Sequence, residues 1–163
     1  MTMIPAQGYT NAAMQWGLDT EPQARAAYEF FRDAVVQEVG FIEHPKIPMT
    51  GASPDGYVGE EGMIEIKCPN TATHIDTLLT QSIPDKYIVQ MQWQMACADR
   101  AWCDYVSFDP RMPEHLRLFV ERIERDDKRI GELERDVEEF LEEMDGKLDA
   151  LNPLHELTVL DAG

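Results

Sequence analysis

The sequence predicts an α/β sandwich in one piece, with its elements in the order α-β-β-β-α-α-β-β-α. The chain of 163 residues has the usual length of a single domain. Its content of 44% hydrophobic and 9% aromatic residues is typical of a folded chain with a buried core. Apolar residues recur with helical spacing in some segments and with strand alternation in others, and no internal repeat or low-complexity linker divides them.

The first part of the chain predicts one helix followed by short strands. Residues 12–38 have the composition of a helix, Asn11 is a suitable N-cap, and Gly40 lies just beyond the expected end. Residues 41–50 alternate loosely and contain two prolines, so we expect one or two short edge strands there.

A turn, a strand and two helices are expected next. Residues 53–56 read Ser-Pro-Asp-Gly, which places favoured residues at each position of a type I turn. Across a short hairpin, residues 62–68 predict a strand that Pro69 ends. A short helix is predicted over 71–81 and a stronger one over 84–100.

The remaining elements are two paired strands and a long helix. Residues 101–108 and 115–123 alternate as strands do and are joined by the turn "DPRMPE". In the last helix, three- and four-residue steps form one apolar stripe on an acidic helix: Ile130, Leu133, Val137, Phe140, Leu141, Met144, Leu148 and Leu151. This stripe packs either on the domain's own core or at a subunit contact, and the sequence leaves both open.

The charge of the chain restricts how it can bind nucleic acid. Its formal net charge is −17, and residues 121–163 hold 15 acidic and 6 basic residues against 16 and 8 in residues 1–120. A protein this acidic is poorly suited to wrapping DNA, so contact would depend on a few placed cations and on bound metal ions.

The sequence also predicts the cellular compartment of the protein. The three cysteines form no CxxC pair, which indicates a reducing environment and argues against a zinc or iron–sulfur framework. No apolar run approaches the roughly 20 residues that span a bilayer, and the first residues do not have the pattern of a signal peptide. We therefore expect a cytoplasmic protein without membrane contact.

The hairpin over residues 53–68 carries the candidate chemistry. Because side chains alternate along a strand, Glu65 and Lys67 should share one side, about 7 Å apart along the strand, while Ile66 points into the core. Phosphodiester hydrolysis needs an activated water and positive charge near the phosphate, and one or two Mg²⁺ ions on hard oxygen ligands supply both. Asp55 and Glu65 would hold the metal, and Lys67 would orient the attacking water or balance developing negative charge.

Each of these residues has an ordinary explanation when it is taken alone. Asp55 is a favoured turn residue, and the sequence "EIK" suits a solvated strand face with a weak ion pair. Taken together, Pro54-Asp55 followed ten residues later by Glu65-X-Lys67 matches the metal-binding signature of the PD-(D/E)XK nuclease superfamily.

Beyond this signature, the chain resembles the phage lambda exonuclease and YqaJ-type viral recombinase family over about residues 14–150. The motifs that carry the resemblance occur in family order: "WGLDTEPQARAAYEF", "ASPDG", "IEIKCP", "YIVQMQWQM", "FDPRM" and "ERDDKRIGELERDVEEFLEEMD". The resemblance implies a restriction-endonuclease-like core, with a central mixed sheet flanked by helices and a long C-terminal helix. It also implies a Mg²⁺-dependent enzyme, with Mn²⁺ as a possible substitute, that degrades the 5′-ended strand of linear duplex DNA and leaves 3′ overhangs.

The family's assembly and setting are implied in the same way. Its members form rings of three around DNA, act in phage-type recombination in a bacterial host, and work with a single-strand-annealing protein. The whole chain, residues 1–163, is then one nuclease domain. Family members usually carry a further N-terminal segment, with a serine and an arginine that bind the substrate's 5′-phosphate, and we expect that segment to be absent here.

The resemblance assigns roles to individual residues. Asp55, Glu65 and the backbone carbonyl of Ile66 would be metal ligands, and Lys67 would be the catalytic lysine. Glu21 matches the helix glutamate that completes the acidic cluster through a water molecule; its alternative is a surface ion pair with Arg25 at i+4.

Four further residues are candidates for DNA contact. Gln90 matches a helix glutamine that faces the site, and Tyr87 and Gln94 lie one turn to either side of it on the same helix face. The alternative for Gln94 is a solvated polar stripe. Arg111, in the turn after the first of the paired strands, would contact a phosphate or a neighbouring subunit.

Two other functions remain open from the sequence. One is a non-catalytic binding module or an acidic DNA mimic on a nuclease-like fold, although mimicry has no use for Lys67. The other is an endonuclease of the same fold, which cleavage of circular DNA would distinguish, because an exonuclease needs an end.

Overall fold

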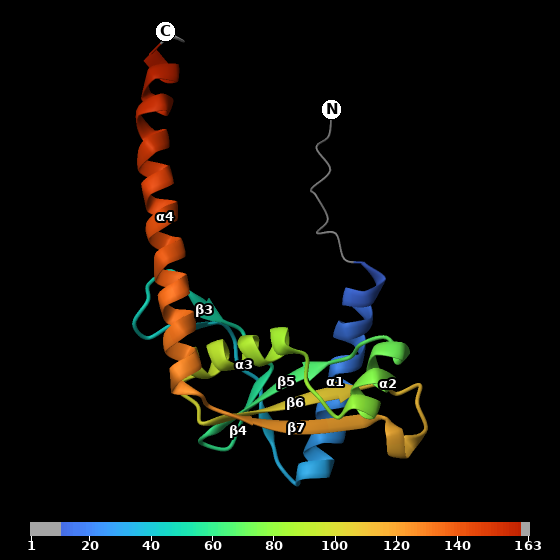
Figure 1. Ribbon diagram of the computed structural model, residues 1–163. Helices are drawn as coiled ribbons and strands as arrows, with labels where there is room; N and C mark the ends of the chain where they lie inside the picture. The colour runs from blue at the N-terminus through green and yellow to red at the C-terminus, as the bar shows by residue number, and fades with distance from the viewer. Residues whose placement is uncertain (1–10, 161–163) are drawn as a thin grey trace, which may run out of the picture.

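The computed structural model describes the backbone of residues 11–160 and the side chains of residues 11–151. A five-stranded sheet in the order β1-β4-β5-β6-β7 forms its centre (Figure 1). The strands are β1 Val36–Gln37, β4 Gly56–Val58, β5 Gly62–Lys67, β6 Trp102–Phe108 and β7 Leu118–Glu124. β5 and β6 pair in parallel and the other neighbours are antiparallel, which confirms the expected mixed sheet.

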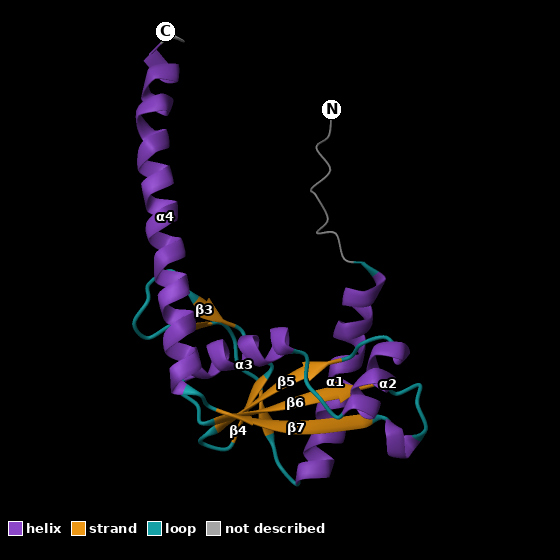
Figure 2. Ribbon diagram, in the orientation of Figure 1, coloured by secondary structure: helices purple, strands orange, loops and turns teal. Residues whose placement is uncertain are grey.

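Helices cover both faces of this sheet (Figure 2). They are α1 Ala12–Arg32, α2 Thr71–Thr80, α3 Asp85–Ala98 and α4 Asp127–Leu160, with a short 3₁₀ helix at Glu114–Leu116. A separate two-stranded sheet, β2 Ile42–Glu43 with β3 Gly51–Ala52, lies against α3. The α/β fold with a long C-terminal helix is therefore confirmed.

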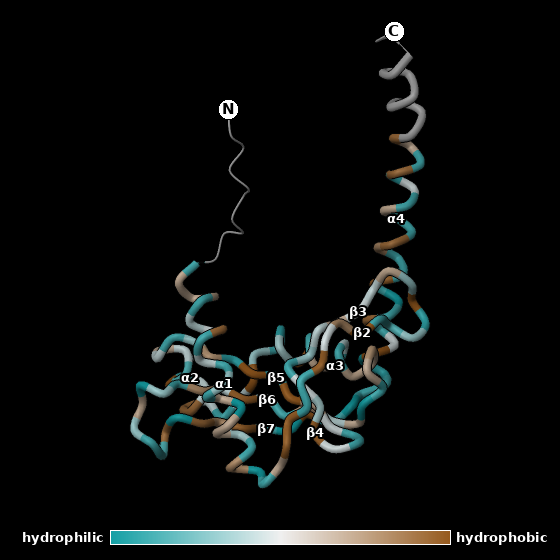
Figure 3. The backbone as a smooth tube through the Cα atoms, turned by 180° about the vertical axis from the view of Figure 1, so that it is seen from behind, coloured by the Kyte–Doolittle hydropathy of each residue, from teal (hydrophilic) through white to brown (hydrophobic). Residues whose placement is uncertain are grey.

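The central strand β5 is buried on both faces. Ile64 and Ile66 pack with Ala24 and Tyr28 of α1 in one core cluster. On the other face, Met63 packs in a second cluster beside α3. Hydrophobic residues accordingly concentrate along β5 and β6 (Figure 3). Since side chains alternate, Glu65 and Lys67 lie on the same face as Met63 and point towards α3.

The C-terminal part of α4 extends away from the rest of the domain (Figure 1). The predicted stripe appears as hydrophobic bands along it (Figure 3), and Phe140, Leu148 and Leu151 are 61%, 52% and 57% exposed. The distal stripe therefore does not pack on the domain's own core. Within residues 11–160, none of the helices has the length and apolarity that crossing a bilayer requires.

The first helix ends earlier than the sequence predicted. Asn11 caps α1 as expected, since its side chain accepts a hydrogen bond from the Met14 amide at 2.8 Å. The expected end near residue 38 is wrong because Asp33 adopts φ 49° and stops the helix at Arg32. The β-branched Val36 then begins β1, which pairs with β4.

The other element boundaries differ in smaller ways. Residues 62–68, 71–81, 84–100 and 101–108 agree with β5, α2, α3 and β6 within a few residues. The second paired strand begins at Leu118 instead of residue 115, because the connection forms a 3₁₀ turn. In the region predicted as a type I turn, Gly56 already belongs to β4, so this short strand was missed.

We expect Gly62→Ala to destabilise the fold. A Cβ at Gly62 would lie 2.1 Å from two ring carbons of Trp102, and the guanidinium carbon of Arg122 lies 3.4 Å from the centroid of the same ring. The change should lower the free energy of unfolding by about 1–3 kcal/mol, the usual cost of overpacking, as measured by chemical denaturation. Gly131→Ala in α4 is the control: a Cβ there meets nothing within 4 Å, so it should stabilise slightly. Equal effects of the two changes would contradict the prediction.

Candidate active site

The β4–β5 hairpin brings Asp55 to the end of β5. Asp55 lies immediately before β4, which pairs with β5 in the register Gly56↔Ile64. One carboxylate oxygen of Asp55, Oδ2, accepts a hydrogen bond from the Ile66 amide at 2.6 Å. The turn residue is thereby fixed beside the segment that carries Glu65 and Lys67.

Glu65 is a buried carboxylate held by three donors. It is only 2% exposed, an unusual position for a glutamate in a fully buried strand. Its Oε1 lies 2.5 Å from the Lys67 ammonium and accepts a hydrogen bond from Gln90 Nε2 at 2.9 Å. Its Oε2 accepts one from Gln94 Nε2, also at 2.9 Å. The buried charge is therefore paired and hydrogen-bonded on both oxygens, as burial of a carboxylate requires.

Lys67 lies between this carboxylate and an aromatic ring. Its ammonium nitrogen is 4.8 Å from the ring centroid of Tyr87, which itself stacks on Tyr105 at 5.8 Å. Burial alone would lower the pKa of Lys67, but the charge and hydrogen bond of Glu65 and the charge of Asp55 raise it overall. Lys67 is accordingly protonated and acts as a cation.

A cavity of about 350 Å³ joins these groups. Asp55, Glu65 and Lys67 line it from the hairpin, together with Ser53 and Ile66; Gln90 lines it from α3 and Glu21 from α1. Met14 and Leu18, 55% and 62% exposed, stand on its α1 side. The residues expected to bind metal and to carry the chemistry thus face one common space.

The electrostatics of this space favour a cation. Burial first, and then the charge of Glu65, raise the pKa of Asp55 from 3.8 to about 7, and the Ile66 hydrogen bond offsets only part of that shift. The charge of Glu21 acts in the same direction. One lysine therefore balances several clustered carboxylates, and a divalent ion would relieve their repulsion.

The donor set fits Mg²⁺. Carboxylate and carbonyl oxygens are the hard ligands that this ion prefers, and it commonly uses only one or two protein carboxylates. Among the described residues, no three His, Cys, Asp or Glu side chains come together as a metal-binding group. The expected set of Asp55, Glu65 and the Ile66 carbonyl is consistent with this, since it needs only two side chains.

Glu21 makes the expected ion pair and also lines the cavity. Its Oε1 pairs with Arg25 Nη2 at 2.6 Å, the i+4 ion pair named as the alternative, and Arg25 also bonds to Glu38. Glu21 nevertheless lines the cavity and its charge acts on Asp55. The ion pair with Arg25 does not remove Glu21 from the site.

The three candidates on α3 lie at different depths. Gln90 is exposed and lines the cavity, and Tyr87 is half-buried against Lys67. Gln94 is only 2% exposed, so it belongs neither to a solvated stripe nor to a surface open to DNA. Its amide donates to Glu65 instead.

Arg111 lies apart from this cavity. Its guanidinium carbon is 4.2 Å from the centroid of the Trp16 ring, and both line a neighbouring pocket of about 340 Å³. Arg111 Nε donates to Asp109 Oδ1 at 2.7 Å. Burial alone would raise the pKa of Asp109, but hydrogen bonds from Arg111 and Thr71 lower it overall. Cys68 lines the same pocket; burial raises the pKa of its thiol to about 12, which disfavours the reactive thiolate.

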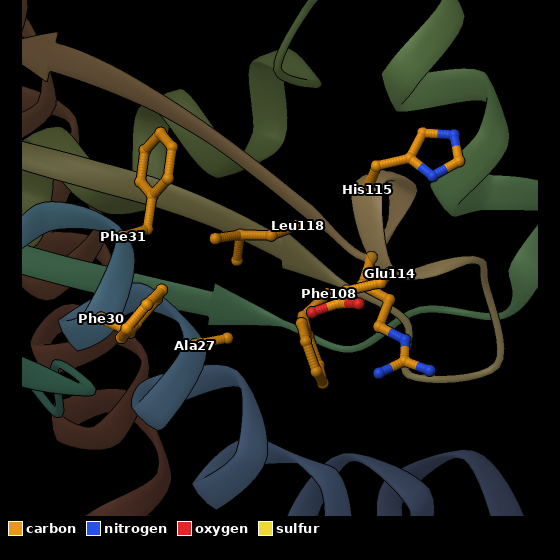
Figure 4. Close-up of a pocket in the computed structure, with 8 residues that line it drawn as sticks. Ala27, Phe30, Phe31, Phe108, Glu114, His115 and Leu118 are labelled. Atoms are coloured by element: carbon orange, nitrogen blue, oxygen red, sulfur yellow. The ribbon is translucent and has the colours of Figure 1, made fainter.

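Another cavity, of about 570 Å³, contains none of the predicted site residues. It lies between the end of α1 and the connection of β6 to β7, where Phe30, Phe31 and Leu118 line it (Figure 4). Arg117 also lines this cavity. Phe30 is 92% exposed. The volume alone does not identify a site, because the convergent polar groups lie in the smaller cavity.

Sequence reasoning missed two features of the site. The first is the hydrogen bond from the Ile66 amide to Asp55, which depends on the hairpin register. The second is the pair of glutamine amides on Glu65. The i, i+4 spacing of Gln90 and Gln94 signalled a shared face, but not that Gln94 is buried or that both amides donate to Glu65.

Known proteins resemble this chain in sequence and in fold. The family model of the YqaJ-like viral recombinase domain matches residues 1–101. An alkaline exonuclease (LHK-Exo) from Laribacter hongkongensis is 52% identical, with a TM-score of 0.86 over 88% of this chain and 74% of that chain. The structure of LHK-Exo in complex with dAMP matches equally well, over 89% and 74%.

A more distant structure supports the fold alone. A phage-related exonuclease from Haemophilus somnus 129PT is 19% identical, with a TM-score of 0.62 over 83% of this chain and 75% of that chain. No curated protein matches the chain.

Proposed function

The chain belongs to the YqaJ-like viral recombinase domain family, and we propose that it is a Mg²⁺-dependent 5′→3′ exonuclease acting on linear double-stranded DNA. Membership of this family implies DNA binding. The 52% identical relative is an alkaline exonuclease that has been crystallised with dAMP, which supports a nuclease with a nucleotide-sized product. Mn²⁺ would substitute for Mg²⁺.

The observation that carries the proposal is the meeting of Asp55, Glu65 and Lys67 in one cavity. Asp55, Glu65 and the Ile66 carbonyl would hold the metal, with Glu21 acting through water. When bound, Mg²⁺ activates a water molecule and neutralises charge on the phosphate. Lys67, kept protonated by Glu65, stabilises the negative charge that develops during cleavage.

The chain's polar residues would guide the DNA backbone. Gln90 is exposed in the cavity, where its amide is available to a phosphate, and Tyr87 holds Lys67 in place. The Arg111 side chain is 46% exposed near the same end of β5, where it is available to the substrate or to a neighbouring subunit.

We also propose the assembly and partner that the family resemblance implies. The enzyme would form a ring of three around DNA in the cytoplasm of a bacterial host, and pass its 3′ overhangs to a single-strand-annealing protein. A ring suits the net charge of −17, since only its inner wall must accept DNA. The exposed stripe on α4 is available for subunit contact.

The test is a strand-resolved cleavage assay. Linear duplex DNA that carries a label at its 5′ ends or at its 3′ ends is incubated with Mg²⁺, with Mn²⁺ or with EDTA. Covalently closed circular DNA is assayed in parallel. With either metal we expect linear DNA to be degraded from its 5′ ends, while circular DNA remains intact. In EDTA we expect no cleavage.

Other outcomes would replace the proposal. Cleavage of circles would indicate an endonuclease of the same fold. A folded protein that cuts no DNA with either metal would favour the non-catalytic binding module. Degradation from the 3′ ends would reverse the proposed polarity.

A further inference from the structure

Two buried glutamines on α3 offer an internal comparison. Gln92 and Gln94 are both 2% exposed and lie two residues apart on the same helix. Gln92 uses both ends of its amide: Nε2 donates to the Glu124 carbonyl at 2.8 Å, and Oε1 accepts from the Asp126 amide at 2.9 Å. Gln92 thereby ties α3 to the connection between β7 and α4, which is a purely structural role.

Gln94 uses only one end of its amide. Its Nε2 donates to Glu65 Oε2 at 2.9 Å, while its buried Oε1 has no hydrogen-bond partner among the residues that the structure describes. An unpaired buried acceptor costs about 1–3 kcal/mol, so this residue is a poor choice for fold stability. The hydrogen bond that Gln94 donates to Glu65 is therefore the contact that explains a glutamine at this position.

The donors on the two oxygens of Glu65 differ in character. Oε1 is contacted by Lys67, whose side chain is 27% exposed, and by the exposed Gln90. Oε2 is contacted by Gln94, which is fixed in the core. The plane of the carboxylate is consequently set from the buried side, while the partners of Oε1 lie on the side of the cavity.

We propose that Gln94 is a positioning residue that fixes the Glu65 carboxylate and so sets the affinity of the site for a divalent metal. The inference rests on the proposed role of Glu65 as a metal ligand. Groups that orient metal ligands by hydrogen bonds typically change metal affinity by about 10- to 100-fold when they are removed. Gln94 acts through Glu65 and does not itself contact the DNA.

The test compares Gln94→Met with Gln92→Met in the full chain. Methionine has nearly the length of glutamine and lacks the amide, so each change removes hydrogen bonds with little change of shape. The thermal unfolding midpoint is measured in EDTA and across a titration with MnCl₂ or MgCl₂. The metal concentration for half-maximal cleavage and the rate at saturating metal are measured separately.

For Gln94→Met we expect an unfolding midpoint in EDTA close to that of the wild type, because removal of the unpaired Gln94 Oε1 offsets the loss of the donor to Glu65 Oε2. The metal concentration for half-maximal stabilisation and for half-maximal cleavage should rise about 10-fold or more. For Gln92→Met the midpoint in EDTA should fall, while both metal concentrations remain those of the wild type.

Two results would overturn the inference, and they are distinguishable. If the wild type responds to metal and Gln94→Met responds at the same concentrations, Gln94 does not position Glu65, although the proposed function stands. If the metal does not stabilise the wild type at all, the metal site fails and the inference fails with it.

Discussion

Lys67→Met should reduce cleavage of linear duplex DNA by about 10²–10³-fold at saturating Mg²⁺, the usual cost of removing one group that stabilises transition-state charge. The Lys67 ammonium lies 2.5 Å from Glu65 Oε1 and lines the cavity, so its charge would lie beside the phosphate in the proposed reaction. Because the role proposed for Lys67 is in the chemical step, the loss should appear mainly in kcat, with substrate binding changed less. Single-turnover cleavage of 5′-labelled DNA measures the loss.

The chain supplies a matched control for this prediction. The Lys86 ammonium also lies 4.8 Å from the centroid of the Tyr87 ring, but Lys86 is exposed and does not line the cavity. Lys86→Met removes the same charge from the same aromatic ring and should leave the rate of cleavage within about twofold. If both variants lost activity equally, general attraction of DNA would explain the effect better than catalysis.

Asp55→Asn should abolish cleavage while stabilising the metal-free protein. In EDTA at pH 8, the free energy of unfolding should rise by roughly 1–3 kcal/mol, allowing for the partial exposure of Asp55. The substitution removes a buried charge next to Glu65, yet the asparagine carbonyl can still accept the hydrogen bond from the Ile66 amide. Chemical denaturation of the wild type and the variant measures the difference.

The pH dependence follows from the same carboxyl group. Burial and the charge of Glu65 raise the pKa of Asp55 from 3.8 to about 7, so the folded state binds this proton more tightly than the unfolded state. The contribution of Asp55 to stability is complete below pH 3.8 and is lost as the pH rises to about 7. Wild-type protein in EDTA should lose this stability over that range, and Asp55→Asn should not. Asp76→Asn, on the exposed face of α2, should behave like the wild type.

The parts of the fold that depend on local patterns could be predicted from the sequence. Alternation placed Glu65 and Lys67 on one side of β5 and Ile66 in the core, and the side-chain positions confirm it. Asn11 marked the start of α1, and Pro69 marked the end of β5. Such signals need no knowledge of distant neighbours.

The remaining features depend on contacts between distant segments. Val36 belongs to a strand only because β4 lies beside it, so a helix through residue 38 was the natural local interpretation. Likewise, "EIK" has the composition of a solvated strand face, whereas Glu65 is almost fully buried because helix α3 supplies its donors. Burial of a charge becomes visible only when its partners are placed.

The bond between the Ile66 amide and Asp55 gives the active site its own spectroscopic reporter. This amide lies on a central strand, yet its acceptor is a side chain that would also serve the metal. Its rate of hydrogen exchange therefore depends on the position of one carboxylate as well as on opening of the sheet. The exchange of a single peptide group, compared with that of its neighbours on β5, can follow occupation of the site without any substrate.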